Sequence, residues 1–215
     1  TGMDEILLTE ISDGVATLTL NRPRQMNALS AELRRRFGEA LALLGADDSV
    51  AVVIITGAGE KAFTAGVDLK ELETAPLTDE ELGPDGPVSR AFRALGKPTI
   101  AAVNGFAITG GMELAINCDI LVASTHARFA DTHARVGIVP GWGMSQILPR
   151  LIGPVRARYM SYTGNFVDAA TARDWGLVLD VLAPAELLPY CRKLAAEIAS
   201  CDRATLTDVR RAIKR

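Results

Sequence analysis

Three short apolar runs, at residues 50–56, 99–103 and 120–123, limit the possible folds more than any other feature of this sequence. Continuous apolar runs of this length are typical of strands that are buried on both faces of a sheet. Between the second and third runs, residues 111–117 leave room for a helix of about two turns. The order strand, helix, strand indicates crossover connections, and therefore an α/β fold.

The segments on either side extend this pattern. Residues 6–11 and 15–20 are rich in β-forming side chains and flank a turn with Asp-Gly, which predicts a hairpin. Ser30 is a good N-cap for a helix whose apolar residues fall on one face, namely Leu33, Phe37, Ala40, Leu41 and Leu44. In the last third we expect helices at 144–151, 155–163, 169–175, 186–199 and 204–215.

The composition fits one large domain and argues against several classes of protein. The chain has 215 residues, of which 48% are hydrophobic, so it can bury a substantial core. Its formal net charge of −3 gives no electrostatic basis for binding DNA or RNA. We find no signal-peptide pattern and no apolar run near the roughly 20 residues that span a bilayer. Three cysteines without metal spacing are typical of free thiols, so we expect a cytoplasmic protein with no metal and no membrane contact.

Residues 74–87 differ in composition from the rest of the chain. They contain three prolines and two glycines among several acidic residues. Such a segment disfavours regular structure, and we expect a mobile surface loop or lid.

Two loops of small residues, within 63–71 and 104–114, each run into the expected start of a helix. The first N–H groups of a helix have no partner within it and can bind an anion. If both loops meet at one point, they form an oxyanion hole with the carboxylate of Glu113 close behind the second loop. This arrangement suits a carbonyl compound whose reaction passes through an enolate.

Two other motifs suggest different chemistries, and the context of each argues against it. Residues 57–62 match the G-x-G-x-x-A spacing of dinucleotide-binding loops, but no helix follows them, so a tight turn fits better. Ser145 follows Gly143, but Ile147 stands where a hydrolase G-x-S-x-G turn has its second glycine. We expect this turn to lead into a helix that is capped near Ser145.

Glu113 and the two histidines are the candidate acid–base groups. Glu113 lies among apolar residues, where a carboxylate is costly without a role, although a first-turn glutamate also stabilises the helix dipole. His126 lies in a connecting turn and is expected to be structural. His133 follows Asp131, which is placed to cap a short helix beginning at Thr132. The dipole of that helix would keep the imidazole neutral near pH 7.

Several of these segments form an ordered series of motifs that covers nearly the whole chain. They are Asn21-Arg22-Pro23 with Asn27-Ala28-Leu29, residues 61–70, Lys97-Pro98 with Asn104-Gly105, residues 110–119, and residues 137–141. The series resembles that of the crotonase superfamily, the enoyl-CoA hydratase/isomerase proteins.

The resemblance implies a fold and an assembly. The fold is a crotonase-like spiral of β-β-α repeats followed by a C-terminal helical region. We place the core with the acyl-CoA site at residues 1–150 and the helical region at 151–215. The family uses this region to form homotrimers, often paired as dimers of trimers. We expect the family's last helices to be incomplete in this sequence, which leaves open what completes the pocket.

The resemblance also assigns roles to particular residues. It gives the two oxyanion-hole N–H groups to Val67 and Gly110, which would hold the thioester oxygen of an acyl-CoA. The positions that match the substrate and CoA path, or lie close to it, are Ala28, Ala65, Val67, Asp68, Leu69, Lys70 and Gly110. Among these, Asp68 is placed to cap the following helix. Coenzyme A enters as part of the substrate, and no separate cofactor is implied.

Hydratases of this family hold one water molecule between two glutamates, which activate it and supply a proton at the α-carbon. Glu113 matches the first glutamate. By spacing back from Gly137, the second falls at His133, and a histidine can also order water and transfer a proton. Asp131 is the fallback carboxylate if the local turn differs from the family's.

We therefore expect an enoyl-CoA hydratase that adds water across the 2,3 double bond of a trans-2-enoyl-CoA. Glu113 would act as the base and His133 as its partner. Since only one of the two glutamates is kept, another superfamily reaction, enoyl-CoA isomerisation or acyl-CoA decarboxylation, is the first alternative. A non-catalytic CoA- or RNA-binding scaffold is the second. Glu113 and the two loops argue against a scaffold, and the acidic sequence argues against RNA.

Overall fold

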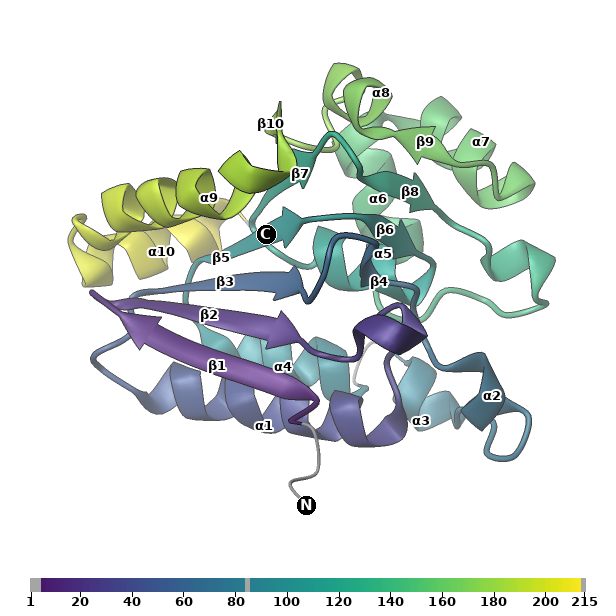
Figure 1. Ribbon diagram of the computed structural model, residues 1–215, viewed down its shortest axis with the longest axis horizontal. Helices are drawn as coiled ribbons and strands as arrows, with labels where there is room; N and C mark the ends of the chain where they lie inside the picture. The colour runs from purple at the N-terminus through teal and green to yellow at the C-terminus, as the bar shows by residue number, and fades with distance from the viewer. Residues whose placement is uncertain (1–4, 84–85, 214–215) are drawn as a thin grey trace.

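The computed structural model describes residues 5–83 and 86–213 and is built around a six-stranded sheet with the order β1-β2-β3-β5-β7-β10 (Figure 1). Its strands are β1 Leu7–Ser12, β2 Val15–Leu20, β3 Val52–Gly57, β5 Thr99–Val103, β7 Ile120–Ser124 and β10 Asp180–Leu182. β1 and β2 form the predicted antiparallel hairpin, and the other neighbouring strands pair in parallel. The three apolar runs are thus the central strands β3, β5 and β7.

A second sheet of four short strands runs beside the first, in the order β4-β6-β8-β9. Its strands are β4 Ala62–Thr64, β6 Phe106–Ile108, β8 Arg128–Ala130 and β9 Val167–Asp168. Each central strand of the large sheet leads directly into one strand of the small sheet: β3 into β4, β5 into β6 and β7 into β8. The chain therefore climbs through repeated β-β-α units, and the predicted crotonase-like spiral is confirmed.

Helices cover both faces of the large sheet (Figure 1). α1 Ala31–Ala46 and α4 Pro87–Leu95 pack against each other on one face, where Phe37 and Phe92 meet with ring centroids 5.8 Å apart. α9 Pro184–Ala199 lies on the opposite face and buries Leu187, Cys191 and Ala195 against the central strands. The apolar face of each helix accounts for its place, because burial of that face provides most of a helix's stability in a folded protein. Ser30 caps α1 as predicted, since its side chain accepts the N–H of Leu33.

The remaining helices are shorter than α1 and α9, and several of them build the site. They are η1 Pro23–Gln25, α2 Leu69–Leu72, α3 Asp79–Leu82, α5 Gly110–Ile116, η2 His133–Arg135, α6 Met144–Ile152, α7 Pro154–Thr163, α8 Ala169–Asp174 and α10 Arg203–Ile213. α5 is buried along its whole length and follows β6 with one intervening residue, Thr109. This places the start of α5 at the edge of the small sheet, where the candidate site lies.

Three expectations need correction. Residues 74–87 are not wholly a loop: they contain α3, which Thr78 and Glu81 cap reciprocally, while residues 84 and 85 lie outside the described residues. α6 begins at Met144 with Gly143 at its N-cap, so Ser145 is not the cap. The last third was expected to be helical but also supplies the two short strands β9 and β10. Lys214 and Arg215, at the end of the last expected helix, lie outside the described residues.

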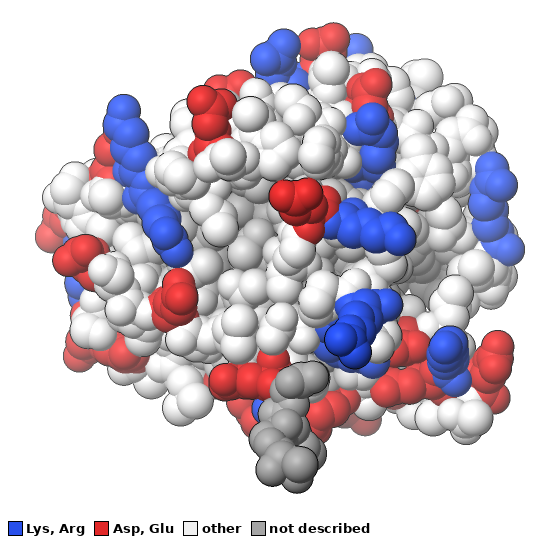
Figure 2. Space-filling view, in the orientation of Figure 1, with Lys and Arg blue, Asp and Glu red and all other residues white. Residues whose placement is uncertain are grey.

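The face of the molecule shown in Figure 2 is not dominated by one sign of charge. Acidic and basic side chains are interspersed over this face. Among the described residues, no helix has the length and apolar character needed to cross a membrane.

Candidate active site

The two small-residue loops meet, as the sequence predicted. Gly66, in the loop after β4, has a φ of +88°, and a Cβ at this position would lie 2.7 Å from the carbonyl oxygen of Ile108. At Gly111, the second residue of α5, a Cβ would lie 2.1 Å from the carbonyl oxygen of Thr64. Since real Cβ atoms do not approach backbone oxygens so closely, glycine at both positions lets one loop lie directly against the other.

The contact leaves two N–H groups side by side. A Cβ on Gly110 would lie 3.6 Å from the backbone nitrogen of Val67. Within the described part of the chain, neither N–H donates a hydrogen bond to a protein acceptor. Two free donors on adjoining loops can bind a single oxygen atom, and the one on Gly110 is also at the positive end of α5.

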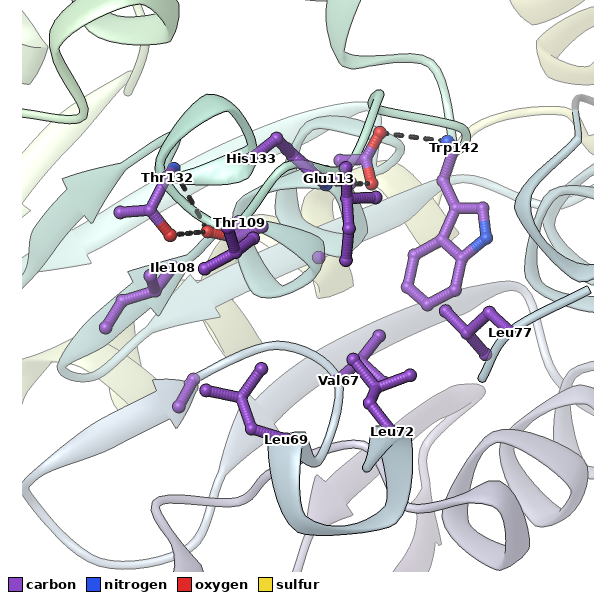
Figure 3. A pocket seen from close by; sticks show the side chains of 14 residues that line it. Val67, Leu69, Leu72, Leu77, Ile108, Thr109, Glu113, Thr132, His133 and Trp142 are labelled. Atoms are coloured by element: carbon purple, nitrogen blue, oxygen red, sulfur yellow. Dashed lines mark hydrogen bonds and ion pairs between the residues drawn. The ribbon is translucent and has the colours of Figure 1, made fainter. Parts of the chain in front are cut away.

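Thr109 ties this loop to the turn that carries His133. Its backbone has φ 53° and ψ −110°, a strained conformation for a residue with a side chain, which costs about 1–3 kcal/mol. Its Oγ1 lies 2.5 Å from Oγ1 of Thr132 and accepts the backbone N–H of Thr132 at 3.1 Å (Figure 3). Hydrogen bonds across the two segments therefore hold the strained residue in place.

Glu113 is buried in the first turn of α5, with 2% of its surface exposed. Its Oε1 accepts two backbone N–H groups, from Trp142 at 2.9 Å and from Met144 at 3.2 Å. Its Oε2 lies 3.5 Å from Nε2 of His133 (Figure 3). One carboxylate oxygen is thus satisfied by the protein, and the other faces the histidine.

His133 is buried between two carboxylates. Its Nδ1 lies 2.6 Å from Oδ1 of Asp131, which also accepts the backbone N–H of His133 at 3.2 Å. Burial lowers the pKa of His133, but the hydrogen bonds to Asp131 and Glu113 outweigh it and raise the pKa to about 9. The imidazole is therefore protonated at pH 7, and the expectation of a neutral ring was wrong. The turn is a single 3-10 turn with Thr132 at its N-cap, so its dipole is weak beside two adjacent carboxylates.

Glu113, His133, Val67 and Gly110 all line one cavity of about 250 Å³. Its walls are mainly apolar, and among the described residues only Glu113 and His133 bring ionisable side chains to it. Figure 3 shows its wider lining, which includes Leu69, Leu72, Leu77, Ile108 and Trp142. An apolar chamber with one carboxylate and one imidazolium can admit an acyl chain and transfer protons to it.

The structure places the other sequence-predicted residues in two groups. Ala65, Val67, Leu69 and Gly110 line the cavity, whereas Ala28, Asp68 and Lys70 do not. Asp68 caps α2 as predicted, accepting the N–H of Lys70 at 3.2 Å, and pairs with Arg22 at 3.0 Å. Lys70 is exposed, and the carbonyl of Ala28 accepts a hydrogen bond from Arg22.

Sequence reasoning missed several lining residues, of which Trp142 is the most important. Its backbone binds Glu113, and its indole Nε1 donates to the carbonyl of Glu81 at 2.8 Å. The available signal was the glycine-rich turn before α6, because N–H groups ahead of a helix are unpaired and can bind a carboxylate. Among the described residues, no cluster of side chains is arranged to hold a metal ion.

Comparison with known proteins agrees with this geometry. Residues 10–215 match the family model described as enoyl-CoA hydratase/isomerase. The chain belongs to this family. One relative is the crotonyl-CoA hydratase of Syntrophomonas wolfei, 40% identical over 91% of this chain and 76% of its own length. Another is the short-chain-enoyl-CoA hydratase of Clostridium acetobutylicum, 39% identical over 90% of this chain and 75% of its own.

Solved structures of the family superpose on nearly the whole chain. The enoyl-CoA hydratase of Mycobacterium tuberculosis H37Rv gives a TM-score of 0.88 at 47% identity, covering 98% of this chain and 90% of its own. An enoyl-CoA hydratase of Mycobacterium avium gives a TM-score of 0.86 at 50% identity, covering 97% of this chain and 88% of its own.

Proposed function

We propose that this chain is an enoyl-CoA hydratase, which adds water across the 2,3 double bond of a trans-2-enoyl-CoA. One observation carries the proposal: Oε2 of Glu113 and Nε2 of His133 lie 3.5 Å apart in an apolar cavity that Val67 and Gly110, from the two small-residue loops, also line. The named activities of the relatives support the same reaction.

Each of these groups has its own role in the proposed reaction. The N–H groups of Val67 and Gly110 bind the thioester oxygen and stabilise the negative charge that develops on it, an effect worth about 10²–10³ in rate for each donor. Glu113 takes a proton from water as the water oxygen attacks the β-carbon. His133 supplies a proton to the α-carbon. Groups of this kind each contribute about 10²–10⁴-fold.

The cavity and its surroundings support an acyl-CoA as substrate. Its apolar walls, which include Ala65 on the same loop as Val67 and Leu69 at the start of α2, suit an acyl chain. The CoA moiety would run outward past Ala28, Asp68 and Lys70, which do not line the cavity. Ala28 precedes Leu29, which pairs with Val67, and Asp68 and Lys70 follow Val67 at the start of α2. The proposal includes no cofactor and no metal.

The proposal extends to assembly and location. Residues 151–215 would form the assembly region of a homotrimer or a dimer of trimers. α7 supports this role, since Val155, Tyr159 and Tyr162 are exposed on it. The protein would act in the cytoplasm, in keeping with Cys191 and Cys201 both being free thiols.

A panel of enoyl-CoA and acyl-CoA thioesters, analysed by mass spectrometry, tests the reaction. The proposal expects crotonyl-CoA to gain one water and the Glu113→Gln variant to convert it far more slowly. If crotonyl-CoA is unchanged but another thioester is isomerised or decarboxylated, the alternative reaction is correct. If every thioester binds and none is converted, the chain is a CoA-binding scaffold.

A further inference from the structure

Asp131 is a buried carboxylate that the hydratase mechanism does not use directly. Its side chain is 1% exposed, and it does not line the cavity. Its Oδ1 contacts both the ring Nδ1 and the backbone N–H of His133, at 2.6 and 3.2 Å. Asp131 therefore reaches the cavity only through His133.

The contact fixes which ring nitrogen faces the substrate. An ionised carboxylate only accepts hydrogen bonds, so Nδ1 of His133 must carry a proton toward Asp131. The opposite nitrogen, Nε2, then points toward Glu113 and the cavity. With Nδ1 protonated at all times, Nε2 is the atom that gains and loses a proton.

We propose that Asp131 is a positioning residue, which holds the His133 ring by Nδ1 and keeps Nε2 protonated for delivery to the α-carbon of the substrate. This inference rests on the proposed hydratase function. It goes beyond that function because it assigns the histidine's charge and orientation to a residue that never touches the substrate.

The charges around His133 agree with this role. Two carboxylates act on the ring, Asp131 from its own turn and Glu113 from α5. α7 packs against the turn and brings the neutral hydroxyl of Ser161 near Asp131. Burial raises the pKa of Asp131, but the opposing effect of His133 and Ser161 is larger. The pKa is therefore below its ordinary value, and Asp131 stays ionised. Its Oδ2 is buried without a hydrogen bond among the described residues, so keeping this carboxylate in the interior has an energetic cost.

The proton balance of the reaction closes with these three groups. Glu113 takes a proton from water while the new C–O bond forms at the β-carbon and the π electrons move to the thioester oxygen. The enolate then collapses and its α-carbon takes the proton from Nε2. Glu113 is now protonated and His133 neutral. A proton passes from Glu113 to His133 across the 3.5 Å between them and restores both groups, while Asp131 stays ionised throughout.

Histidine NMR on the unaltered protein is the first test. The sequence has only two histidines, and exposed His126 serves as the internal reference. With ¹⁵N-labelled histidine, neutral His133 at high pH should carry its proton on Nδ1, and its pKa should lie well above the ordinary histidine value of 6.5. A neutral His133 protonated on Nε2 would overturn the proposal without any variant.

The Asp131→Asn variant is the second test, because asparagine keeps the shape and removes the charge. The His133 titration should move down by about one pH unit or more, the usual effect of losing an adjacent opposite charge. The alkaline limb of kcat/KM for crotonyl-CoA should move down with it. His133→Ala should lack this limb, and adding Asp131→Asn to it should change nothing further. Asp202→Asn is the matched control. Asp202 accepts the N–H of Thr205 in α10 and does not line the cavity. Its replacement should change neither the His133 titration nor the alkaline limb of kcat/KM.

The two proposals fail in different ways. If Asp131→Asn lowers the rate but leaves both the His133 titration and the alkaline limb in place, Asp131 is only structural. The same conclusion follows if Asp131→Asn lowers the rate by the same factor in the His133→Ala variant as in the parent protein. If the parent hydrates nothing while the NMR titration still shifts, the positioning role stands and the hydratase assignment fails.

Discussion

The backbone N–H of Trp142 lies 2.9 Å from Oε1 of Glu113, and the indole Nε1 of the same residue donates to the carbonyl of Glu81 at 2.8 Å. One residue therefore connects the proposed base to α3 and to the segment that brings Leu77 to the cavity wall. Its backbone and its side chain serve different ends of the site, so their effects can be separated by mutation.

Trp142→Phe should weaken substrate binding more than catalysis. Phenylalanine keeps the backbone N–H on Glu113 but loses part of the ring that lines the cavity and the indole donor, whose loss typically lowers stability by about 1 kcal/mol. We expect KM for crotonyl-CoA to rise while kcat changes little, measured by steady-state kinetics beside a urea titration. Trp175→Phe is the control, because Trp175 packs against Tyr159 and Arg156 instead. Equal rises in KM for both variants would contradict the prediction.

Glu113→Gln should leave the fold intact and remove the base. The glutamine oxygen can still accept the N–H groups of Trp142 and Met144, but it cannot take a proton from water. We expect kcat to fall by about two orders of magnitude or more, with CoA binding nearly unchanged. Turnover close to that of the parent would remove Glu113 from the mechanism.

Gly110→Pro should slow enolate chemistry strongly by deleting one oxyanion donor. Proline is tolerated at the first position of a helix, where Gly110 lies, although any Cβ there would come within 3.2 Å of the Trp142 ring. Gly110→Ala is the matched control, since it introduces the same Cβ and keeps the N–H. We expect the proline variant to have a kcat about 10²–10³-fold below that of the alanine variant. Melting curves of both variants must show that they fold. Equal kcat values for the two variants would contradict the assignment of the Gly110 N–H to the oxyanion hole.

His133→Glu should be a poor hydratase although it restores two glutamates. The new carboxylate would stand beside Asp131, whose oxygen now lies 2.6 Å from Nδ1 of His133, and like charges this close repel. Asp131→Asn removes the repulsion. We therefore expect the double variant to hydrate crotonyl-CoA faster than His133→Glu alone, compared by initial rates at pH 7. A double variant that is slower would show that residue 133 does not act in the way the second glutamate does.

The charge on His133 also predicts how stability depends on pH. Its pKa is raised from 6.5 to about 9 in the folded protein. The contribution to the free energy of unfolding is therefore complete below about pH 6.5 and is lost as the pH rises through 9. It should amount to about 3 kcal/mol at most, which a urea series across this range measures against His133→Gln. If the free energy of unfolding changes with pH in the same way for the parent and for His133→Gln, the raised pKa of His133 is contradicted.

Most of the framework could be predicted because it depends on local patterns. The uninterrupted apolar runs became β3, β5 and β7, and the one-sided helix after Ser30 became α1. The strands β9 and β10 could not be predicted, since two or three residues are too few to show a period.

The site was predictable in position but not in charge. Small residues and glycines located the two loops, and the family resemblance paired Glu113 with His133. The state of His133 depends on Asp131 and on Glu113, which is 20 positions away in the sequence and reaches it only through the fold. A dipole argument based on the local turn could not include that second carboxylate.

The two proposed proton-transfer residues are anchored by different parts of the chain, and this has a consequence for how the enzyme can change. Glu113 is held by main-chain donors at positions 142 and 144, which any amino acid except proline can supply. His133 is held by the side chain at position 131. Random substitution therefore disturbs the second anchor far more readily than the first. Positions 131 and 133 form a compact pair for directed evolution, in which the reaction type can be varied while the base keeps its place.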